Sequence, residues 1–142
     1  EIQLPSGFSI SSDLNYQLGE EELDDGTTSP SRHAAPLFGV TRLSYKANRL
    51  NLQLYATYQG ERKAEDMPEE EKGKTEIYAL DENGNAYAPS WYTLNFKALY
   101  QINNSLSASA GIENITDQRY RPYSSGISAP GRNFIIALQA NF

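Results

Sequence analysis

The sequence contains no cysteine, so it can form neither a disulfide framework nor a zinc site with cysteine ligands. It also lacks any run of 18 apolar residues, which excludes a transmembrane helix. A membrane-spanning strand is not excluded, because half of its residues face away from lipid and can be polar. The first residues, EIQLPSG, have neither the basic region nor the apolar core of a signal peptide. We therefore expect this beginning to lie in the interior of a longer protein.

Methionine and tryptophan are scarce, with one residue each, whereas tyrosine occurs 10 times in 142 residues. This balance favours strands over helices. The net charge is −6, and 14 of the 18 acidic residues lie in two segments, residues 19–36 and 60–90, that lack strand periodicity. An acidic surface binds phosphate poorly, so nucleic acid is not an expected partner.

Apolar and polar residues alternate with period two in most of the remaining chain, as in strands whose successive side chains face opposite sides of a sheet. The pattern predicts six strands, at residues 8–18, 37–46, 50–59, 91–100, 105–114 and 131–142. In the last segment Phe134, Ile136, Leu138, Ala140 and Phe142 form one apolar face. Each segment has about ten residues, the length that a tilted strand needs to cross a bilayer.

The connections between these strands alternate strictly in length. Residues 5–7, 46–49 and 101–104 form tight turns, whereas 19–36, 60–90 and 116–131 form long polar loops. Short turns at one end and long loops at the other are typical of an outer-membrane barrel. The segment EIQL before the first turn is then the end of a seventh strand.

The last tight turn also predicts a register. If Asn103 is the centre of this hairpin, Leu94 and Ala98 meet Ile112 and Ala108 on the same face of the sheet. A soluble β-sandwich of about seven strands, acting as a binding module of a secreted protein, is the alternative, because it alternates in the same way. Its strands are usually shorter, about five or six residues.

The segment GIENITDQRYRPYSSGISAPGRNF, residues 111–134, resembles the C-terminal signature of TonB-dependent outer-membrane receptors. In that signature a strand ends in Glu-Asn, D-x-R/K-Y follows, and P-G-R-N leads into a final strand closed by an aromatic residue. The matching residues are Glu113, Asn114, Asp117, Arg119, Tyr120, Pro130, Gly131, Arg132, Asn133 and Phe142. HAAPLFG from His33 and YAPSWYTLNFKALY from Tyr87 also fit, so the resemblance covers essentially the whole chain. The segment RYRPYSSGISAPGRNF is similar in sequence to members of the Bacteroidetes branch of the family.

The resemblance implies an all-β, antiparallel transmembrane β-barrel of 22 strands, whose lumen holds an N-terminal plug. No segment of this sequence matches the plug or the TonB box, and six strands cannot close such a barrel without leaving unpaired edges in hydrocarbon. We therefore expect residues 1–142 to be the C-terminal part of the barrel, its last six strands plus the end of a seventh. The expected location is the outer membrane of a Gram-negative bacterium.

The function implied by the resemblance is uptake of a scarce ligand, siderophore-bound iron above all, or haem, cobalamin or a glycan, with energy delivered by TonB. TonB would act on the N-terminal region that this sequence lacks, and a passive porin-like channel is the alternative if that region is absent. Outer-membrane lipid and lipopolysaccharide are further expected partners. The chain is not expected to be an enzyme, because no Ser/His/Asp set, phosphate loop or pair of catalytic carboxylates is visible.

The resemblance also assigns a role to the last strand. Phe142, with Leu138 and Phe134 behind it, would be the element that the barrel-assembly machinery recognises. A compatible alternative is that Phe142 is one more lipid-facing aromatic residue of the barrel girdle.

Several charged residues are predicted to contact other groups. Arg119, Arg121 and Tyr123 lie in the last external loop, where they suit an anionic ligand. Asp13, Arg42 and Lys97 fall on the polar face of their strands, and the resemblance places Arg132 there too; these four are predicted contacts to the lumen or the plug. For Arg132, a structural pair with an acidic neighbour is the favoured alternative.

No metal site and no cofactor are expected. His33, the only histidine, is interpreted as a surface residue rather than a haem ligand. The run EEELDD from Glu20 is interpreted as a solvated charge run rather than a site for divalent cations. DENGN from Asp81 resembles a calcium loop but lacks the required glutamate, so Asn83-Gly84 is predicted to be a turn.

Overall fold

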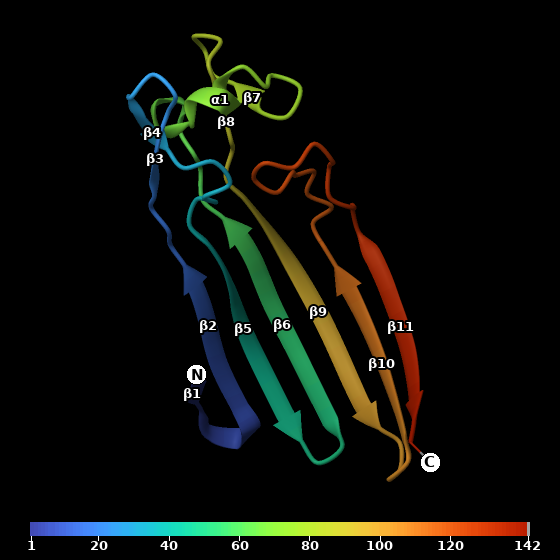
Figure 1. The fold of residues 1–142 in the computed structure, drawn as a ribbon. Coiled ribbons are helices and arrows are strands. Elements are labelled where there is room, and N and C mark those ends of the chain that lie inside the picture. Colours follow the sequence, from blue (N-terminus) through green and yellow to red (C-terminus); the bar gives the residue numbers. More distant parts are fainter. Residues whose placement is uncertain (142) are drawn as a thin grey trace.

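The computed structural model describes residues 1–141, and its main body is one antiparallel sheet of seven strands. The strands, in their order across the sheet, are β1 (Ile2–Gln3), β2 (Phe8–Asn15), β5 (Phe38–Ala47), β6 (Leu50–Gln59), β9 (Trp91–Gln101), β10 (Leu106–Glu113) and β11 (Asn133–Ala140). They form a single curved layer in which consecutive long strands lie side by side (Figure 1). The predicted all-β fold, six long strands preceded by the end of a seventh, is confirmed.

One face of the sheet is a continuous apolar surface, because the register brings the apolar residues of neighbouring strands together. The central row across this face consists of Ile10, Leu43, Leu54, Phe96, Ile112 and Phe134. Ile10 is 41% exposed, Leu54 46% and Phe134 69%, so no second layer of the described residues packs on them. A β-sandwich buries this face between two sheets, and the sandwich alternative is therefore wrong for this chain.

The hairpin between β9 and β10 differs from the predicted register by two residues. Phe96 pairs with Ile112 and Ala98 with Ala110, which puts the centre of the turn at Asn104 instead of Asn103. The side chain of Asn103 accepts a hydrogen bond from the Ser105 N–H (2.9 Å), a local turn bond that the alternation pattern does not contain. A shift of two residues leaves every side chain on its predicted face.

The observed strand ends also differ from the predicted ones. β2 ends at Asn15 rather than at residue 18, because its partner β5 begins at Phe38, opposite Asn15, and offers no further residue to pair with. β10 ends at Glu113 because Asn114 has a φ of 48°, a left-handed conformation that breaks the strand. Alternation in the sequence thus continues past the point where pairing stops.

The three long connections gather at one end of the sheet, opposite the tight turns (Figure 1). We call residues 19–36, 60–90 and 116–131 the first, second and third loops, and the three together the loop cap. It contains short elements that the sequence did not predict: the hairpins β3 (Glu20–Glu22) with β4 (Thr28–Pro30) and β7 (Ala79–Leu80) with β8 (Ala86–Tyr87), the 3-10 turn η2 (Ala64–Asp66) and the helix α1 (Glu69–Lys72). The remaining 3-10 turn, η1 (Pro5–Gly7), forms the first tight turn. No helix within residues 1–141 is long and apolar enough to span a membrane.

The buried apolar cluster of the described residues lies in this cap and not on the sheet. It consists of Met67, Tyr78, Ala86 and Ala88, which are 0 to 7% exposed, with Ile77 and Tyr123 packed against it. The cap therefore has a small core of its own.

The last strand, β11, forms one edge of the sheet and pairs with β10. Phe134 and Leu138 point to its apolar face, and each is 69% exposed. The predicted assembly role of Phe142 concerns a residue outside the described range. The roles assigned to all three residues stay predictions.

Candidate functional site: the loop cap and the polar face

Arginine side chains join the first two loops of the cap. Arg32, in the first loop, forms an ion pair with Glu70 at the start of helix α1 in the second loop. Arg62, in the second loop, donates a hydrogen bond from Nη2 to the Ala34 carbonyl in the first loop (3.0 Å). Arg62 is only 9% exposed, so this bond lies within the cap and not on its surface.

The third loop is tied to the other two. Arg121 donates from Nη1 to the carbonyls of Glu76 (2.8 Å) and Ile77 (3.0 Å) in the second loop. His33, in the first loop, lies 3.0 Å from the Ser124 hydroxyl through its Nδ1 atom. The three loops therefore hold one another in a single unit above the sheet.

A buried carboxylate lies inside this unit. Glu71, from α1, is 1% exposed and accepts hydrogen bonds from Lys74 Nζ and the Tyr78 hydroxyl, both at 2.6 Å. Burial opposes ionisation, but the hydrogen bonds from Lys74 and Tyr78 outweigh it and lower the pKa of Glu71. Burial and the bond to Glu71 raise the pKa of Tyr78. At neutral pH the cap therefore encloses an ionised carboxylate with both partners in place.

The predicted ligand contacts separate into two places. Arg119 and Arg121 line one cavity of about 390 Å³, which lies between the second and third loops. Tyr123 packs against the buried cluster of the cap, with its ring centre 5.9 Å from that of Tyr78 and 5.6 Å from the guanidinium carbon of Arg62. The volume of the cavity is within the range of about 300–1,000 Å³ found for small-molecule sites.

Two aromatic residues that the sequence analysis did not assign as contacts form a wall of this cavity. Trp91 begins β9, and its ring centre lies 4.2 Å from that of Tyr120 in the third loop. The indole Nε1 of Trp91 is buried without a hydrogen-bond partner among the described residues. The signal for Trp91 in the sequence was its position as the only tryptophan, at the loop end of a predicted strand.

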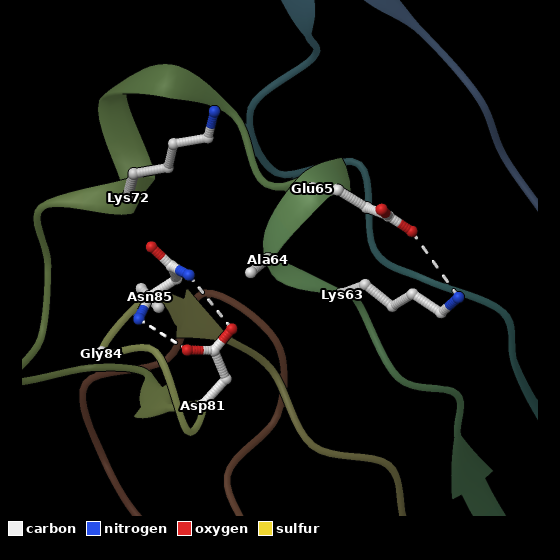
Figure 2. A pocket seen from close by; sticks show the side chains of 8 residues that line it. Lys63, Ala64, Glu65, Lys72, Asp81, Gly84 and Asn85 are labelled. Carbon is white, nitrogen blue, oxygen red and sulfur yellow. Dashed lines mark hydrogen bonds and ion pairs between the residues drawn. The ribbon is translucent and has the colours of Figure 1, made fainter.

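A second cavity of the cap, of about 600 Å³, is lined by Lys63, Lys72, Asp81 and Asn85 (Figure 2). The Asp81 carboxylate accepts hydrogen bonds from the backbone N–H groups of Asn83 (2.9 Å) and Asn85 (2.8 Å). The Asn85 backbone bond is the main cause that lowers the pKa of Asp81. These bonds hold the β7–β8 turn, as predicted for Asn83-Gly84, and use the carboxylate that a calcium loop would need.

The charged residues predicted to contact the lumen or the plug differ in whether they have partners among the described residues. Asp13 and Arg42, on neighbouring strands, form an ion pair. Lys97 is exposed on the same face and forms no ion pair with any described residue. Arg132 precedes β11 and donates from Nε to the Ile115 carbonyl (3.0 Å). Their assignment as contacts to the lumen or the plug stays a prediction.

The signature residues form a hydrogen-bonded closure at the base of the third loop. Asn114 is 3% exposed, and its side chain both accepts from the Gln118 N–H and donates to the Gln118 carbonyl, each at 2.8 Å. The same amide group reaches the Pro130 carbonyl at 3.3 Å on the returning side of the loop. Asn114 thus joins the two ends of the loop that carries Arg119 and Arg121.

Asp117 completes this closure. Its carboxylate accepts a hydrogen bond from the Arg132 N–H (2.8 Å), and its φ of 56° turns the chain back toward β11. A Cβ atom at Gly131 would lie 2.6 Å from the Asp117 carboxylate, so a larger residue there would push this carboxylate away from its present position. Asn114, Asp117 and Arg132 of the signature therefore have a structural role at the base of the third loop.

Within the part of the chain that the structure describes, no group of three or more histidine or acidic residues could hold a metal ion. The cavity of Arg119 and Arg121 instead presents guanidinium groups beside aromatic rings and is lined by no acidic residue, although the cap as a whole is acidic. Such groups bind anionic or aromatic ligands.

Comparison with protein-family models and with curated protein sequences gives no match. Solved structures match over nearly the whole chain. The copper transporter OprC matches with a TM-score of 0.76 at 15% identity, over 99% of this chain and 21% of the transporter. The ferric enterobactin receptor of Pseudomonas aeruginosa matches with a TM-score of 0.70 at 21% identity, over 98% of this chain and 20% of the receptor.

The siderophore receptor PiuA of Acinetobacter baumannii matches with a TM-score of 0.59 at 18% identity, over 97% of this chain and 20% of the receptor. This chain thus spans about a fifth of the length of the solved structures that it matches. They are TonB-dependent receptors, and the resemblance seen in the sequence is confirmed for the fold. The likeness to the Bacteroidetes branch stays a prediction.

Proposed function

We propose that residues 1–142 form the C-terminal part of the wall and external mouth of a TonB-dependent transporter in the outer membrane of a Gram-negative bacterium. The observation that carries this proposal is the exposed apolar face of the sheet, on which Ile136 is 87% and Leu138 69% exposed. Water would penalise this face by about 25 cal/mol for each Å² of apolar surface, whereas lipid removes the penalty.

The positions of the tyrosines support a sheet that spans the membrane with the loop cap at its external surface. Tyr58 pairs with Tyr92 on the apolar face near the cap, whereas Tyr45 and Tyr100 lie near the tight turns. Membrane barrels carry such aromatic residues at both borders of an apolar band about 25 Å tall. The two groups of tyrosines therefore mark the two membrane surfaces, with the cap outside the cell.

We propose an iron chelate as the cargo. An anionic chelate would be held by Arg119 and Arg121, beside the rings of Trp91 and Tyr120. Two of the matching structures are named as receptors for ferric enterobactin or a siderophore, and one as a copper transporter. Copper(I) prefers thiolate and thioether ligands, and this chain has no cysteine and a single methionine, Met67, that is 0% exposed. The chemistry of the cavity therefore favours the chelate.

The test is uptake by cells that carry the full-length gene product under iron limitation. We expect uptake of a radiolabelled ferric siderophore that stops when TonB is deleted, and Arg119→Ala should reduce it while Arg49→Ala, in a tight turn at the far end of the sheet, should not. Uptake that continues without TonB would contradict the active mechanism and favour a passive channel.

We propose in addition that the end of the chain directs assembly of the barrel. Phe134 and Leu138 form an exposed apolar stripe on β11, the strand that the barrel-assembly machinery would meet at the edge of the sheet. Phe142→Asp should lower the amount of heat-modifiable protein in the outer membrane. An unchanged amount would contradict this role.

A further inference from the structure

The polar face of the sheet carries a small cavity below the base of the third loop, which shares only Tyr120 with the cavity assigned to the cargo. It has a volume of about 180 Å³. Its lining includes Tyr55, Thr57, Thr93, Asn95, Glu113 and Tyr120. This volume is below the range of about 300–1,000 Å³ of small-molecule sites, so the cavity can admit a group of the size of a side-chain head.

Most polar groups of the cavity wall already have partners. The hydroxyls of Thr57 and Thr93 lie 2.6 Å apart, and the Asn95 amide donates to the Thr93 hydroxyl (3.1 Å). The Asn95 carbonyl oxygen accepts from the Asn114 N–H (2.9 Å). Thr93 and Asn95 are 2% and 4% exposed. The wall is therefore fixed, and its amide and threonine groups have little capacity left for another molecule.

Glu113, the last residue of β10, is the acidic residue of this wall and has no such partner among the described residues. It lines the cavity with a half-buried side chain and forms no ion pair with any residue that the structure describes. An ionised carboxylate only accepts hydrogen bonds, and its partial burial is unfavourable unless a donor or an opposite charge compensates it. The cavity thus presents one negative charge beside the aromatic rings of Tyr55 and Tyr120.

We propose that this cavity binds one cationic hydrogen-bond donor, a guanidinium or primary ammonium group, with the Glu113 carboxylate as its acceptor and the rings of Tyr55 and Tyr120 beside it. Carboxylates form their strongest hydrogen bonds with such donors, and tyrosine rings attract cations. The group can belong to a basic side chain that enters from the polar side of the sheet or to a free amine. The proposal does not depend on the cargo.

Lys97, on the neighbouring strand β9, is a described residue that could imitate such a ligand. It pairs with Gly111, two residues before Glu113 on the same strand and on the same face. A lysine side chain can reach a diagonal neighbour at this separation. The structure shows the two unpaired, so Lys97→Met serves as the control that separates an internal ion pair from a bound group.

The test is carbodiimide labelling of the full-length protein in detergent micelles, in the presence of ethylenediamine, followed by mass spectrometry of the labelled peptides. Glu82, an exposed acid in the cap, is the internal standard. The same experiment is repeated with Lys97→Met, with n-propylguanidinium added as a competitor, and in denaturant.

Two results would support the proposal. If a basic side chain of the protein fills the cavity, Glu113 should label about tenfold more slowly than Glu82 in the folded protein, or be cross-linked to a lysine other than Lys97. Denaturant should remove this protection. If the group is a free cation, Glu113 should label readily, and n-propylguanidinium should suppress this labelling without changing that of Glu82.

Two results would overturn it. One is labelling of Glu113 at the rate of Glu82 without competition by n-propylguanidinium. The other is protection that disappears in Lys97→Met, because Lys97 would then be the partner of Glu113.

Discussion

The sheet and the loop cap are stabilised in opposite ways. The large apolar side chains of the sheet, such as Leu54 and Ile136, are exposed, so the strands depend on their backbone ladders and on a surrounding apolar phase. The cap buries Met67 and Glu71 almost completely and joins its loops through side chains such as Arg62. The sheet thus needs an apolar surrounding phase to cover its exposed side chains, whereas the cap is stabilised by contacts among its own residues. We expect changes in one region to leave the other largely intact.

The largest effect is expected from a charge on the apolar face of the sheet. Ile10→Arg places a guanidinium in the central row of this face and should cost about 2–4 kcal/mol, the value for arginine at the bilayer midplane of a membrane barrel. The measurement is urea unfolding of the full-length protein in phosphatidylcholine vesicles.

The matched control is Ser9→Arg, one residue away on the polar face. Its unfolding midpoint should stay close to that of the wild type. Equal losses in the two variants would contradict the assignment of the two faces.

The next effect should be confined to the cap. Met67→Ala removes a fully buried side chain from the cap core and should cost about 2 kcal/mol, the low end of the range for such changes, because a small core can relax. Limited proteolysis should then cut residues 60–90 faster, while heat-modifiable migration of the barrel stays unchanged. Ile127→Ala, at a side chain that is 79% exposed, is the control that should change neither property.

An effect of similar size, confined to the third loop, is expected where the two regions meet. Asn114→Ala removes the hydrogen bonds that close the third loop and should cost about 1–3 kcal/mol locally. Asn114→Gly keeps the left-handed conformation and separates the lost hydrogen bonds from backbone strain. Hydrogen exchange of residues 116–131 measures both variants, and equal protection in wild type and Asn114→Ala would refute the closure.

The last prediction concerns acid. The pKa of Glu71 is lowered from its usual value near 4.5, so its ionised form stabilises the cap fully above that pH, and this contribution is lost as the pH falls through the lowered pKa. Proteolysis of the cap, followed from pH 7 down to about 3 with an acid-stable protease, should accelerate in this window. Glu71→Gln should reduce the acceleration, whereas Glu82→Gln, an exposed acid, should retain it.

The sequence was sufficient to predict the sheet because one physical rule, alternation with period two, acts on every strand. The faces of Ile10, Leu54 and Phe134 and the alternation of short turns with long loops all follow from it. The exact register does not follow, because a shift of two residues at Asn104 conserves every face.

The cap could not be predicted in the same way. Its contacts join residues far apart in the chain, such as Arg121 to the Glu76 carbonyl and His33 to Ser124, and no local pattern encodes them. The cavity wall of Trp91 and Tyr120 was missed for that reason. The signature around Asn114 was visible in the sequence as a resemblance, but its structural role required the hydrogen bonds themselves.

Contact between the apolar face of the sheet and lipid can be measured with single-cysteine spin labels along β6, since residues 1–142 contain no cysteine. The full-length protein in lipid vesicles is measured by electron paramagnetic resonance with oxygen, which concentrates in lipid, and with a water-soluble nickel chelate. We expect labels at Leu52, Leu54 and Ala56 to collide with oxygen and those at Gln53 and Tyr55 not to do so, an alternation with period two. Equal accessibility to the nickel chelate along the whole strand would contradict it.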